Sequence, residues 1–330
     1  MQQNRLELER DIVTAAEPGF ANDVRRGLTA SPKFLSPKYF YDDLGSKLFE
    51  SICLLPEYYL TRAETEILVT HGDEIARSLN GPVRLVELGS GSSQKTRLLI
   101  QALLATQNEL SYQPIDISET TLSESARALE NDYPRLHVTP VAGDYTKSLD
   151  LPHRAENERV LVLFLGSNIG NYNKVEALAL LRTLRAALSE GDGLLIGADL
   201  KKPESELIAA YDDPIGVTAA FNLNVLARIN RELGGDFDVR EFVHRAIYNE
   251  REGRMEMYLV SRSAANVRIR ALDLDVSFEE DEGIHTENSY KFQSEELEDL
   301  SRRAGFEVRN VWLDSGARFS SNLWVAVNGQ

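Results

Sequence analysis

Residues 84–95 of the chain read RLVELGSGSSQK, an apolar run followed directly by glycines and small polar residues. A short apolar run that ends in glycine is typical of a buried strand turning into a helix at the edge of a parallel sheet. Gly89 and Gly91 allow the backbone to turn sharply and to lie close to a ligand. The segment therefore predicts a strand, a ligand-binding loop and a helix, in that order.

The same alternation continues as far as residue 198. Short apolar runs follow at 112–117, 138–142, 160–165 and 194–198, and they are separated by amphipathic stretches at 95–106, 119–131 and 174–188. Buried runs that alternate with amphipathic helices predict a parallel, doubly wound sheet. We expect the tail, residues 307–312 and 319–327, to add a hairpin to this sheet.

A second lobe is predicted outside the alternating pattern. The first sixty residues read as mostly helical, and the alternation stops after Asp199. Beyond it we expect helices over 201–250, including 219–233, and then paired strands at 255–260 and 267–272. The prediction is an α/β protein with two domains, residues 60–200 plus 286–330 and residues 1–59 plus 201–285.

Two helix starts are indicated by capping residues. Residues 61–64, TRAE, are typical of a capping box, in which Thr61 accepts a hydrogen bond from the first turn and Glu64 reaches back. Ser294 is expected to cap a second helix, because the acids Glu295 and Glu296 that follow it suit the positive end of a helix dipole.

Composition limits the function classes. The 330 residues are 42% hydrophobic and carry 52 acids against 36 bases, a net charge of −16, which argues against nucleic acid or an anionic membrane as partner. The single cysteine, Cys53, excludes an intrachain disulfide and a cysteine-based zinc cage. The N-terminal stretch MQQNRLELERD is rich in charged residues from Arg5 onward, which argues against a signal peptide, and the longest apolar run, 160–166, is too short to span a membrane. We expect a cytoplasmic monomer.

The sequence of the loop limits the classes of ligand that it can bind. Gln94 stands where a dinucleotide fingerprint has its third glycine, and the Gly-Lys-Ser/Thr of a P-loop is missing. What remains, an acid (Glu87) followed by Gly-x-Gly, is typical of S-adenosylmethionine (SAM) methyltransferases. Another nucleotide, or a tight turn with a purely structural role, stays open at this point.

Two later strand ends carry acids that suit a nucleoside. Asp116 ends the second predicted strand, where a carboxylate can accept both ribose hydroxyls. Asp144 follows the third, where it can accept the adenine amino group while Tyr145 stacks on the base. The plainer alternatives are a helix cap, which Ser118 fits better than Asp116, and an ordinary loop acid at Asp144.

Further motifs give the chain a family resemblance that covers nearly its whole length. These motifs are SPKYFYDDLGSKLFE (36–50), LPEYYLTRAE (55–64), VELGSGSSQKTR (86–97), FLGSNIGN (164–171), AYDDPIGVTAAFNLNVLARINRELGGDFD (210–238) and HTENSYKF (285–292). In them the chain resembles the SAM-dependent L-histidine Nα-methyltransferases, which form hercynine in ergothioneine biosynthesis.

The resemblance implies a fold and a set of roles. It implies a Rossmann-like class I SAM methyltransferase domain, with a smaller substrate-binding domain formed by the N-terminus and an insertion and closing over it. It implies that Tyr41 and Tyr58 are catalytic. The residues implied to contact histidine are Tyr58, Asn171, Tyr211, Met257, Glu287 and Ser289. Those implied to contact SAM are Gly89, Lys95, Asp116, Asp144 and Tyr145. No metal is implied. A different amino acid or small amine as acceptor remains the alternative.

The chemistry of the substrate residues agrees with these roles. Asn171 and Tyr211 can donate to a carboxylate without adding charge. Glu287 and Ser289 are two apart in a segment that we expect to be extended, so they point the same way and can hold two atoms of an imidazole ring. Taken alone, Tyr58 could be a core aromatic, Asn171 a turn residue and Glu287 a solvated acid. His285 is expected to be a loop residue without a catalytic role.

Overall fold

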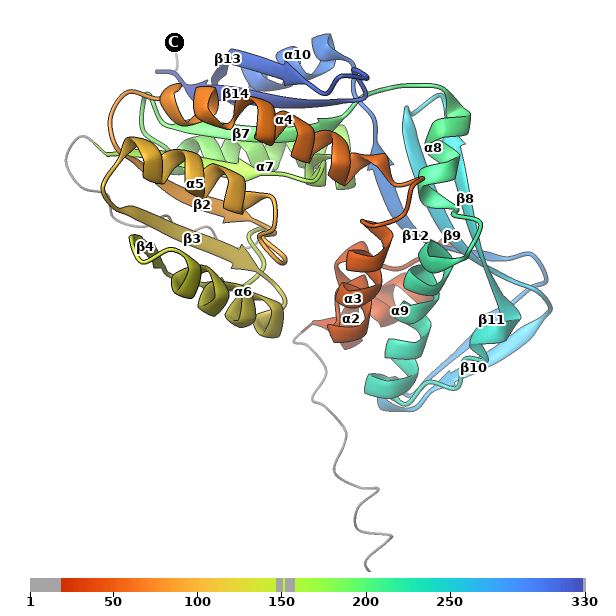
Figure 1. Cartoon of the computed structure of the whole chain (residues 1–330). Coiled ribbons are helices and arrows are strands. Elements are labelled where there is room, and N and C mark those ends of the chain that lie inside the picture. The colour runs from red at the N-terminus through yellow and green to blue at the C-terminus, as the bar shows by residue number, and fades with distance from the viewer. Residues whose placement is uncertain (1–18, 147–150, 152–157, 329–330) are drawn as a thin grey trace, which may run out of the picture. The chain divides into compact units, whose positions relative to one another are not determined.

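The computed structural model describes residues 19–146, 151 and 158–328, which form two compact units (Figure 1). The first unit comprises the described residues up to Ile52, together with 208–247 and 255–287. The second comprises 53–207, 248–254 and 288–330. The predicted division of roles between a SAM domain and a substrate domain stays a prediction. Residues 1–18, part of the stretch expected to be mostly helical, lie outside the described residues.

The second unit is built on an eight-stranded sheet. Its strands follow the order β13-β14-β7-β6-β2-β3-β4, with β5 beside β3. The parallel strands are β2 (Val83–Leu88), β3 (Leu110–Asp116), β4 (Leu136–Val138), β5 (Val141–Ala142), β6 (Arg159–Phe164) and β7 (Gly193–Asp199). The antiparallel hairpin β13 (Phe306–Leu313) and β14 (Phe319–Ala326) joins at β7. The predicted Rossmann-like sheet and its added hairpin are confirmed.

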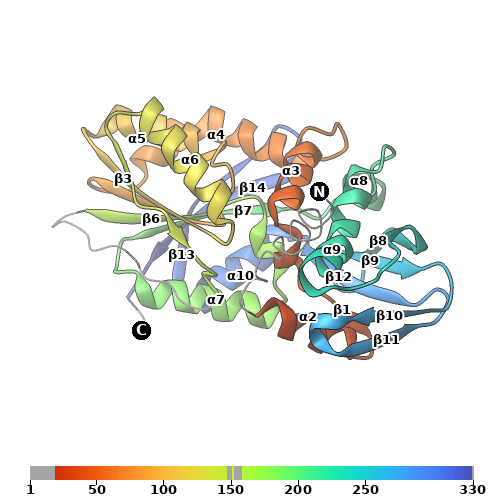
Figure 2. The same cartoon turned by 90° about the horizontal axis from the view of Figure 1, so that it is seen from below.

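Helices cover both faces of this sheet, because its parallel strands are apolar on both sides. Figure 2 shows α4, α5 and α6 on one face and α7 and α10 on the other. Their bounds are α4 Tyr59–Arg77, α5 Thr96–Thr106, α6 Glu119–Asp132, α7 Lys174–Ala187 and α10 Ser294–Ala304. The side chains of Val86, Val162 and Ile196 are fully buried in the core beneath Leu181 and Leu184 of α7.

The first unit combines a four-stranded sheet with helices. The sheet order is β1-β12-β9-β8, from β1 (Lys33–Phe34), β12 (Gly283–Tyr290), β9 (Arg254–Ser261) and β8 (Phe242–Asn249). A separate hairpin is formed by β10 (Ala265–Ile269) and β11 (Leu274–Phe278). The helical elements are α2 (Phe20–Leu28), η1 (Pro37–Phe40), α3 (Asp43–Ile52), α8 (Glu204–Tyr211), α9 (Val217–Leu233), η3 (Val239–Glu241) and η4 (Arg270–Leu272). Residues 204–207 of α8 belong to the second unit.

Two secondary-structure predictions for this region are wrong. Residues 242–249, expected to be helical, form β8, in which exposed Val243 alternates with buried His244, so that polarity does not follow burial. The strand expected at 255–260 lies within β9, but of the strand expected at 267–272 only 267–269 belong to β10, and 270–272 form η4. Strands β9 and β10 do not pair with each other, because β10 pairs with β11.

Both predicted helix caps are also wrong. Helix α4 begins at Tyr59, two residues before Thr61, and Glu64 lies buried inside the helix. Helix α10 is capped by Gln293 rather than Ser294, and the Gln293 N–H donates to the Glu296 carboxylate at 2.9 Å. The acids predicted in its first turn are there.

Candidate active site

The glycine loop between β2 and α5 is fixed to the neighbouring strand β3. The Gly89 N–H donates to the Ile115 carbonyl at 2.8 Å, and the Gly91 N–H donates to Asp116 Oδ2 at 2.8 Å. Gly89 has φ of +70°, and a Cβ there would lie 3.0 Å from Asn168 Nδ2. A glycine is therefore needed at Gly89, and the loop is held at the carboxyl edge of the sheet.

Open space adjoins this edge in the described part of the chain. A Cβ added at Gly91 or at Gly143 would meet no described heavy atom within 4 Å. Ser90 Oγ is buried in the same loop and has no hydrogen-bond partner among the described residues. A loop with room beside its backbone and an unsatisfied hydroxyl fits a polar ligand such as SAM at the position where α/β sheets bind nucleotides.

The acids after β3 and β5 have local partners. Asp116 also accepts from the Ser118 N–H at 2.9 Å, and Ser118 caps α6, as the sequence suggested. Asp144 Oδ1 accepts from the Thr146 N–H at 3.0 Å. A Cβ at Gly89 would lie 3.8 Å from Tyr145 Cε1, so the structure brings Gly89, Asp116 and Tyr145 together at one edge.

Lys95, the last residue of the loop, forms an ion pair with the Glu64 carboxylate of α4. Glu64 is fully buried and also accepts from the Gly166 N–H, at 3.0 Å to Oε1 and 2.9 Å to Oε2. Glu64 thus connects the glycine loop to the end of β6. The sequence pattern predicted a capping role for Glu64 and did not reveal this connection.

Glu87 lies beneath the loop and not in it. Its carboxylate accepts from Thr96 Oγ1 at 2.8 Å and from the Tyr112 hydroxyl. Burial raises the pKa of Glu87 from 4.5 to about 7, although the two hydroxyl donors and nearby Lys95 act in the opposite direction. Burial also raises the pKa of Tyr112, and Glu87 adds to that shift.

The ring of Tyr145 is held by two aromatic neighbours. It packs edge-on against Phe164 at 6.0 Å between ring centroids, and its hydroxyl accepts from that of Tyr172 at 3.1 Å. Burial raises the pKa of the Tyr145 hydroxyl well above 10, so the hydroxyl stays neutral. Sequence reasoning did not identify Tyr172.

The acceptor motif after β6 forms a tight turn, η2 (Asn168–Asn171), that lies against β12. A Cβ at Gly170 would be 2.8 Å from the Tyr290 carbonyl oxygen, so this approach requires glycine. Ser167, with φ of +58°, accepts from the Asp199 N–H at 3.0 Å through its hydroxyl. These contacts fix Asn171 at the end of η2.

Tyr58 and Ser289, the other two predicted substrate residues of the second unit, adjoin a buried cluster around Asp199. Tyr58 is 8% exposed, and the hydroxyl of its neighbour Tyr59 donates to Asp199 at 2.8 Å. Ser289 is 4% exposed, and its Oγ accepts from Lys291 Nζ at 2.9 Å. Sequence reasoning missed Asp199, although it follows a buried strand just as Asp116 does.

The predicted catalytic residue Tyr41 and the remaining predicted substrate residues belong to the first unit. The ring of Tyr41 packs edge-on against Phe49 and Phe221, at 5.6 Å each. Tyr211 ends α8 and is 7% exposed, and its carbonyl accepts from His244 Nε2 at 2.8 Å.

Met257 and Glu287 lie on neighbouring strands of the first unit's sheet. The Met257 carbonyl in β9 accepts from Thr286 Oγ1 at 3.1 Å, beside half-buried Glu287 in β12. Glu287 and Ser289 therefore do share an extended strand, as predicted. His285 lies in the same strand and not in a loop, with its ring 5.1 Å from that of Tyr258.

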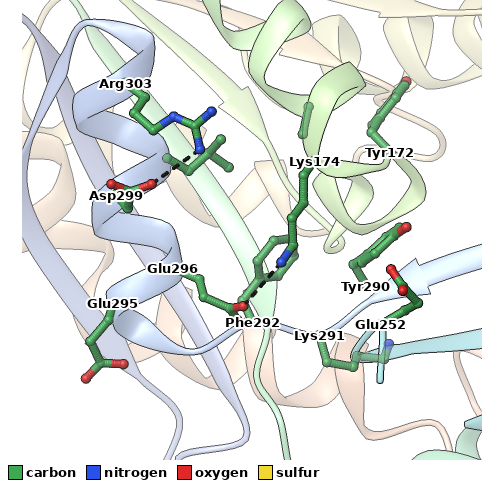
Figure 3. Close-up of a pocket in the computed structure, with 12 residues that line it drawn as sticks. Tyr172, Lys174, Glu252, Tyr290, Lys291, Phe292, Glu295, Glu296, Asp299 and Arg303 are labelled. Atoms are coloured by element: carbon green, nitrogen blue, oxygen red, sulfur yellow. Dashed lines mark hydrogen bonds and ion pairs between the residues drawn. The ribbon is translucent and has the colours of Figure 1, made fainter. Parts of the chain in front are cut away.

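A further cavity, of about 290 Å³, lies in the second unit between the start of α7, helix α10 and the end of β12 (Figure 3). None of the predicted site residues lines it. Its lining residues are Tyr172, Lys174, Ala177, Glu252, Tyr290, Lys291, Phe292, Glu295, Glu296, Asp299, Leu300 and Arg303. Lys174 and Arg303 are paired with Glu296 and Asp299, so these charges are satisfied within the wall.

The described ranges contain neither a cluster of metal ligands nor a membrane-spanning helix. Among those residues, no three His, Cys, Asp or Glu side chains gather as metal ligands would. No helix in the same ranges combines the length and the apolar character needed to cross a bilayer.

Comparison with known proteins identifies the family. Residues 20–326 match the model of a family described as histidine-specific, SAM-dependent methyltransferases. The chain belongs to this family. The methyltransferase is 44% identical over 312 residues to a histidine N-alpha-methyltransferase of Mycolicibacterium smegmatis, covering 94% of this chain and 96% of that one.

Two further relatives extend the comparison. A histidine N-alpha-methyltransferase of Mycobacterium tuberculosis is 43% identical to the methyltransferase over 302 residues, covering 91% of this chain and 93% of that protein. Ergothioneine biosynthesis protein 1 of Schizosaccharomyces pombe is 29% identical over 290 residues, which are 85% of this chain but 37% of that protein.

Proposed function

We propose that this methyltransferase transfers three methyl groups to the α-amino nitrogen of free L-histidine and forms hercynine, the first step of ergothioneine biosynthesis. The observation that carries the proposal is the match to a histidine-specific family over residues 20–326. The names of the relatives, two histidine N-alpha-methyltransferases and an ergothioneine biosynthesis protein, support it.

The cofactor side uses residues at the edge of the large sheet. SAM supplies an electrophilic methyl group on a sulfonium sulfur. Gly89 provides the close backbone approach, Asp116 accepts the ribose hydroxyls, and Asp144 and Tyr145 hold the adenine. Lys95, kept in place by Glu64, pairs with the carboxylate of the cofactor's amino-acid part.

The substrate side uses a separate contact for each group of histidine. Asn171 and Tyr211 donate to the carboxylate, and Met257 forms an apolar wall. Glu287 and Ser289 hold the two ring nitrogens. A charge-assisted hydrogen bond such as that of Glu287 contributes about 1.5–3 kcal/mol, roughly ten- to a hundredfold in affinity, which is enough to select histidine over apolar amino acids.

The chemical step needs a neutral amine with its lone pair aligned. The nitrogen lone pair forms the new N–C bond, and the C–S bond breaks with its electron pair going to sulfur. The hydroxyls of Tyr41 and Tyr58 accept amine N–H bonds and orient the lone pair. The nitrogen loses a proton after the first and the second transfer, and the third leaves a quaternary ammonium with no lone pair, which ends the series.

The protein is further proposed to act as a cytoplasmic monomer without a metal. Its net charge of −16 supports the absence of nucleic-acid and anionic-membrane partners, since both attract basic surfaces. Size-exclusion chromatography with light scattering, together with metal analysis of the active enzyme, tests these points. Activity that chelators abolish and a divalent metal restores would contradict the metal-free chemistry.

Mass spectrometry of the products tests the function. The enzyme is incubated with SAM and each of the twenty amino acids in turn. We expect histidine to gain up to three methyl groups and the other amino acids to gain none. Product that stops at one methyl group would overturn trimethylation. Comparable turnover of another amino acid would favour the alternative, a methyltransferase for a different amine.

A variant of Glu287 tests whether the proposed site is responsible for the selection of histidine. We expect Glu287→Gln to lower kcat/KM for histidine about tenfold or more, because a charged acceptor for the ring N–H is lost. The KM for SAM serves as the control and should stay near the wild-type value. An unchanged kcat/KM would remove Glu287 from the site.

A further inference from the structure

Asp199, at the end of β7, is the centre of a buried charge cluster within the second unit. Its carboxylate lies 2.5 Å from Lys202 Nζ and 2.9 Å from Lys291 Nζ, and it accepts from the Tyr59 hydroxyl at 2.8 Å. The side chains of Asp199 and Lys291 are fully buried, and that of Lys202 is 6% exposed. Two ammonium groups thus share one buried carboxylate.

Backbone hydrogen bonds place Lys291 in this cluster. The Phe292 N–H donates to the Asp199 carbonyl at 2.9 Å, and the Lys201 N–H donates to the Phe292 carbonyl at 2.9 Å, so the chain after β12 runs beside the end of β7. The Lys291 N–H donates to the Gly253 carbonyl at 2.8 Å. The backbone of Lys291 is therefore held by hydrogen bonds, and its ammonium group is held by Asp199.

The need to neutralise the charge of Asp199 does not explain why Lys291 is buried beside it. One ammonium group balances one carboxylate, and Lys202 already lies closer to Asp199 than Lys291 does. Removing a second ammonium group from water is costly, and burial already lowers the pKa of Lys202 beside the same carboxylate. Charge balance with Asp199 alone therefore does not account for the burial of a second lysine, and a further contact of its ammonium group, with Ser289, becomes informative.

The contact with Ser289 indicates a role for Lys291. An ammonium group can only donate hydrogen bonds, so in the 2.9 Å contact Ser289 Oγ is the acceptor. The hydroxyl hydrogen of Ser289 consequently points away from Lys291. A serine held in this way presents a donor to a substrate, and the group of histidine that matches it is the unprotonated nitrogen of a neutral imidazole.

We propose that Lys291 is a positioning residue, held by Asp199, which fixes Ser289 as a hydrogen-bond donor to the unprotonated ring nitrogen of the substrate. This inference rests on the proposed function and deepens it. Glu287, on the same strand, takes the ring N–H, so the two residues together recognise a neutral imidazole with one donor and one acceptor.

Lys291→Met and Lys202→Met form a matched pair of variants for the test. Each removes one ammonium group from Asp199 and leaves the other in place, but only Lys291→Met removes the donor to Ser289. We expect Lys291→Met to raise the KM for histidine about tenfold, with kcat and the KM for SAM changed far less. Lys202→Met should leave the KM for histidine within about twofold of the wild type, because the Lys291 donor to Ser289 stays in place.

A double-mutant cycle separates positioning from stability. If Lys291 acts through Ser289, Lys291→Met should add little to the KM for histidine once Ser289→Ala is present. Equal effects of Lys291→Met and Lys202→Met, or additive effects in the cycle, would overturn the proposal. If Lys291→Met fails to fold, Lys291→Arg, which retains the charge, replaces it in the same cycle. The KM for histidine is then compared for Lys291→Arg, Ser289→Ala and the double variant, and additive effects would again overturn the proposal. A Ser289→Ala enzyme with unchanged histidine kinetics would instead contradict the proposed site.

Discussion

Glu87 illustrates how one buried carboxyl group connects the elements around the glycine loop. Its carboxyl group lies beneath the glycine loop and connects β2 to α5 through Thr96 and to β3 through Tyr112. Burial raises its pKa from 4.5 to about 7. The folded state thus keeps a carboxyl group that is largely protonated in mildly acidic solution, and it must bury a charge as the pH rises.

The sign of the resulting pH effect follows from linkage. A carboxyl group whose pKa is higher in the folded state contributes its stability below pH 4.5 and loses it as the pH rises through about 7. The loss amounts to about 3 kcal/mol. Glu87→Gln cannot ionise, so we expect its unfolding free energy relative to wild type to rise between pH 5 and pH 8. Urea denaturation at several pH values measures this difference.

The control for this prediction is Glu124→Gln, which removes a carboxylate from an exposed position on α6. A difference in unfolding free energy between wild type and Glu87→Gln that stays constant across the pH range would contradict the raised pKa of Glu87. A pH-dependent difference of the same size in Glu124→Gln would assign the effect to net charge and not to burial.

At the scale of elements, the contact between η2 and β12 joins the acceptor motif to the strand that carries Glu287 and Ser289. Gly170→Ala would place a methyl group 2.8 Å from the Tyr290 carbonyl oxygen, which is backbone and cannot rotate away. We expect a loss of about 1–3 kcal/mol in unfolding free energy and a higher KM for histidine, because η2 must move from β12 and carry Asn171 with it.

The matched control is Gly72→Ala in α4, where a Cβ would meet its nearest neighbours at 3.8 and 4.0 Å. This substitution should be neutral or stabilising, since alanine suits a helix better than glycine does. Thermal unfolding and histidine kinetics of both variants check the pair. If Gly170→Ala behaves like Gly72→Ala, η2 does not depend on this close approach.

Elements with a clear period could be predicted from the sequence, and those set by long-range contacts could not. The apolar runs that became β2, β6 and β7 are buried on both faces, so their composition alone revealed them. Strand β8 was missed because its burial alternates while its polarity does not. Glu64 was misread because its partner Gly166 is 102 residues away.

The candidate site follows the same rule. The glycine loop and the strand-end acids were predictable, since a parallel sheet gathers the carboxyl ends of its strands at one edge. The partners that hold these residues were not. Nothing in the local sequence indicates that Lys95 pairs with Glu64 or that Lys291 contacts Asp199, because only the fold brings these charges together.

At the scale of the whole molecule, the chain passes between its two units five times, after residues 52, 207, 247, 254 and 287. The last three crossings fall within β8, β9 and β12. Glu287 and Ser289 stand on either side of the last one. Each unit therefore carries only part of the proposed substrate set, whereas the proposed SAM residues all belong to the second unit.

Hydrogen exchange tests this division of roles. S-adenosylhomocysteine alone should slow amide exchange in the second unit, at residues 88–96, 115–119 and 142–146, because a bound ligand suppresses local opening there. Histidine added with it should also slow exchange in the first unit, at β12 and the end of α8, while hairpin β10–β11 serves as the unaffected control. If histidine protected only segments of the second unit, Tyr211 and Glu287 could not be substrate residues, and the first unit would have a different role.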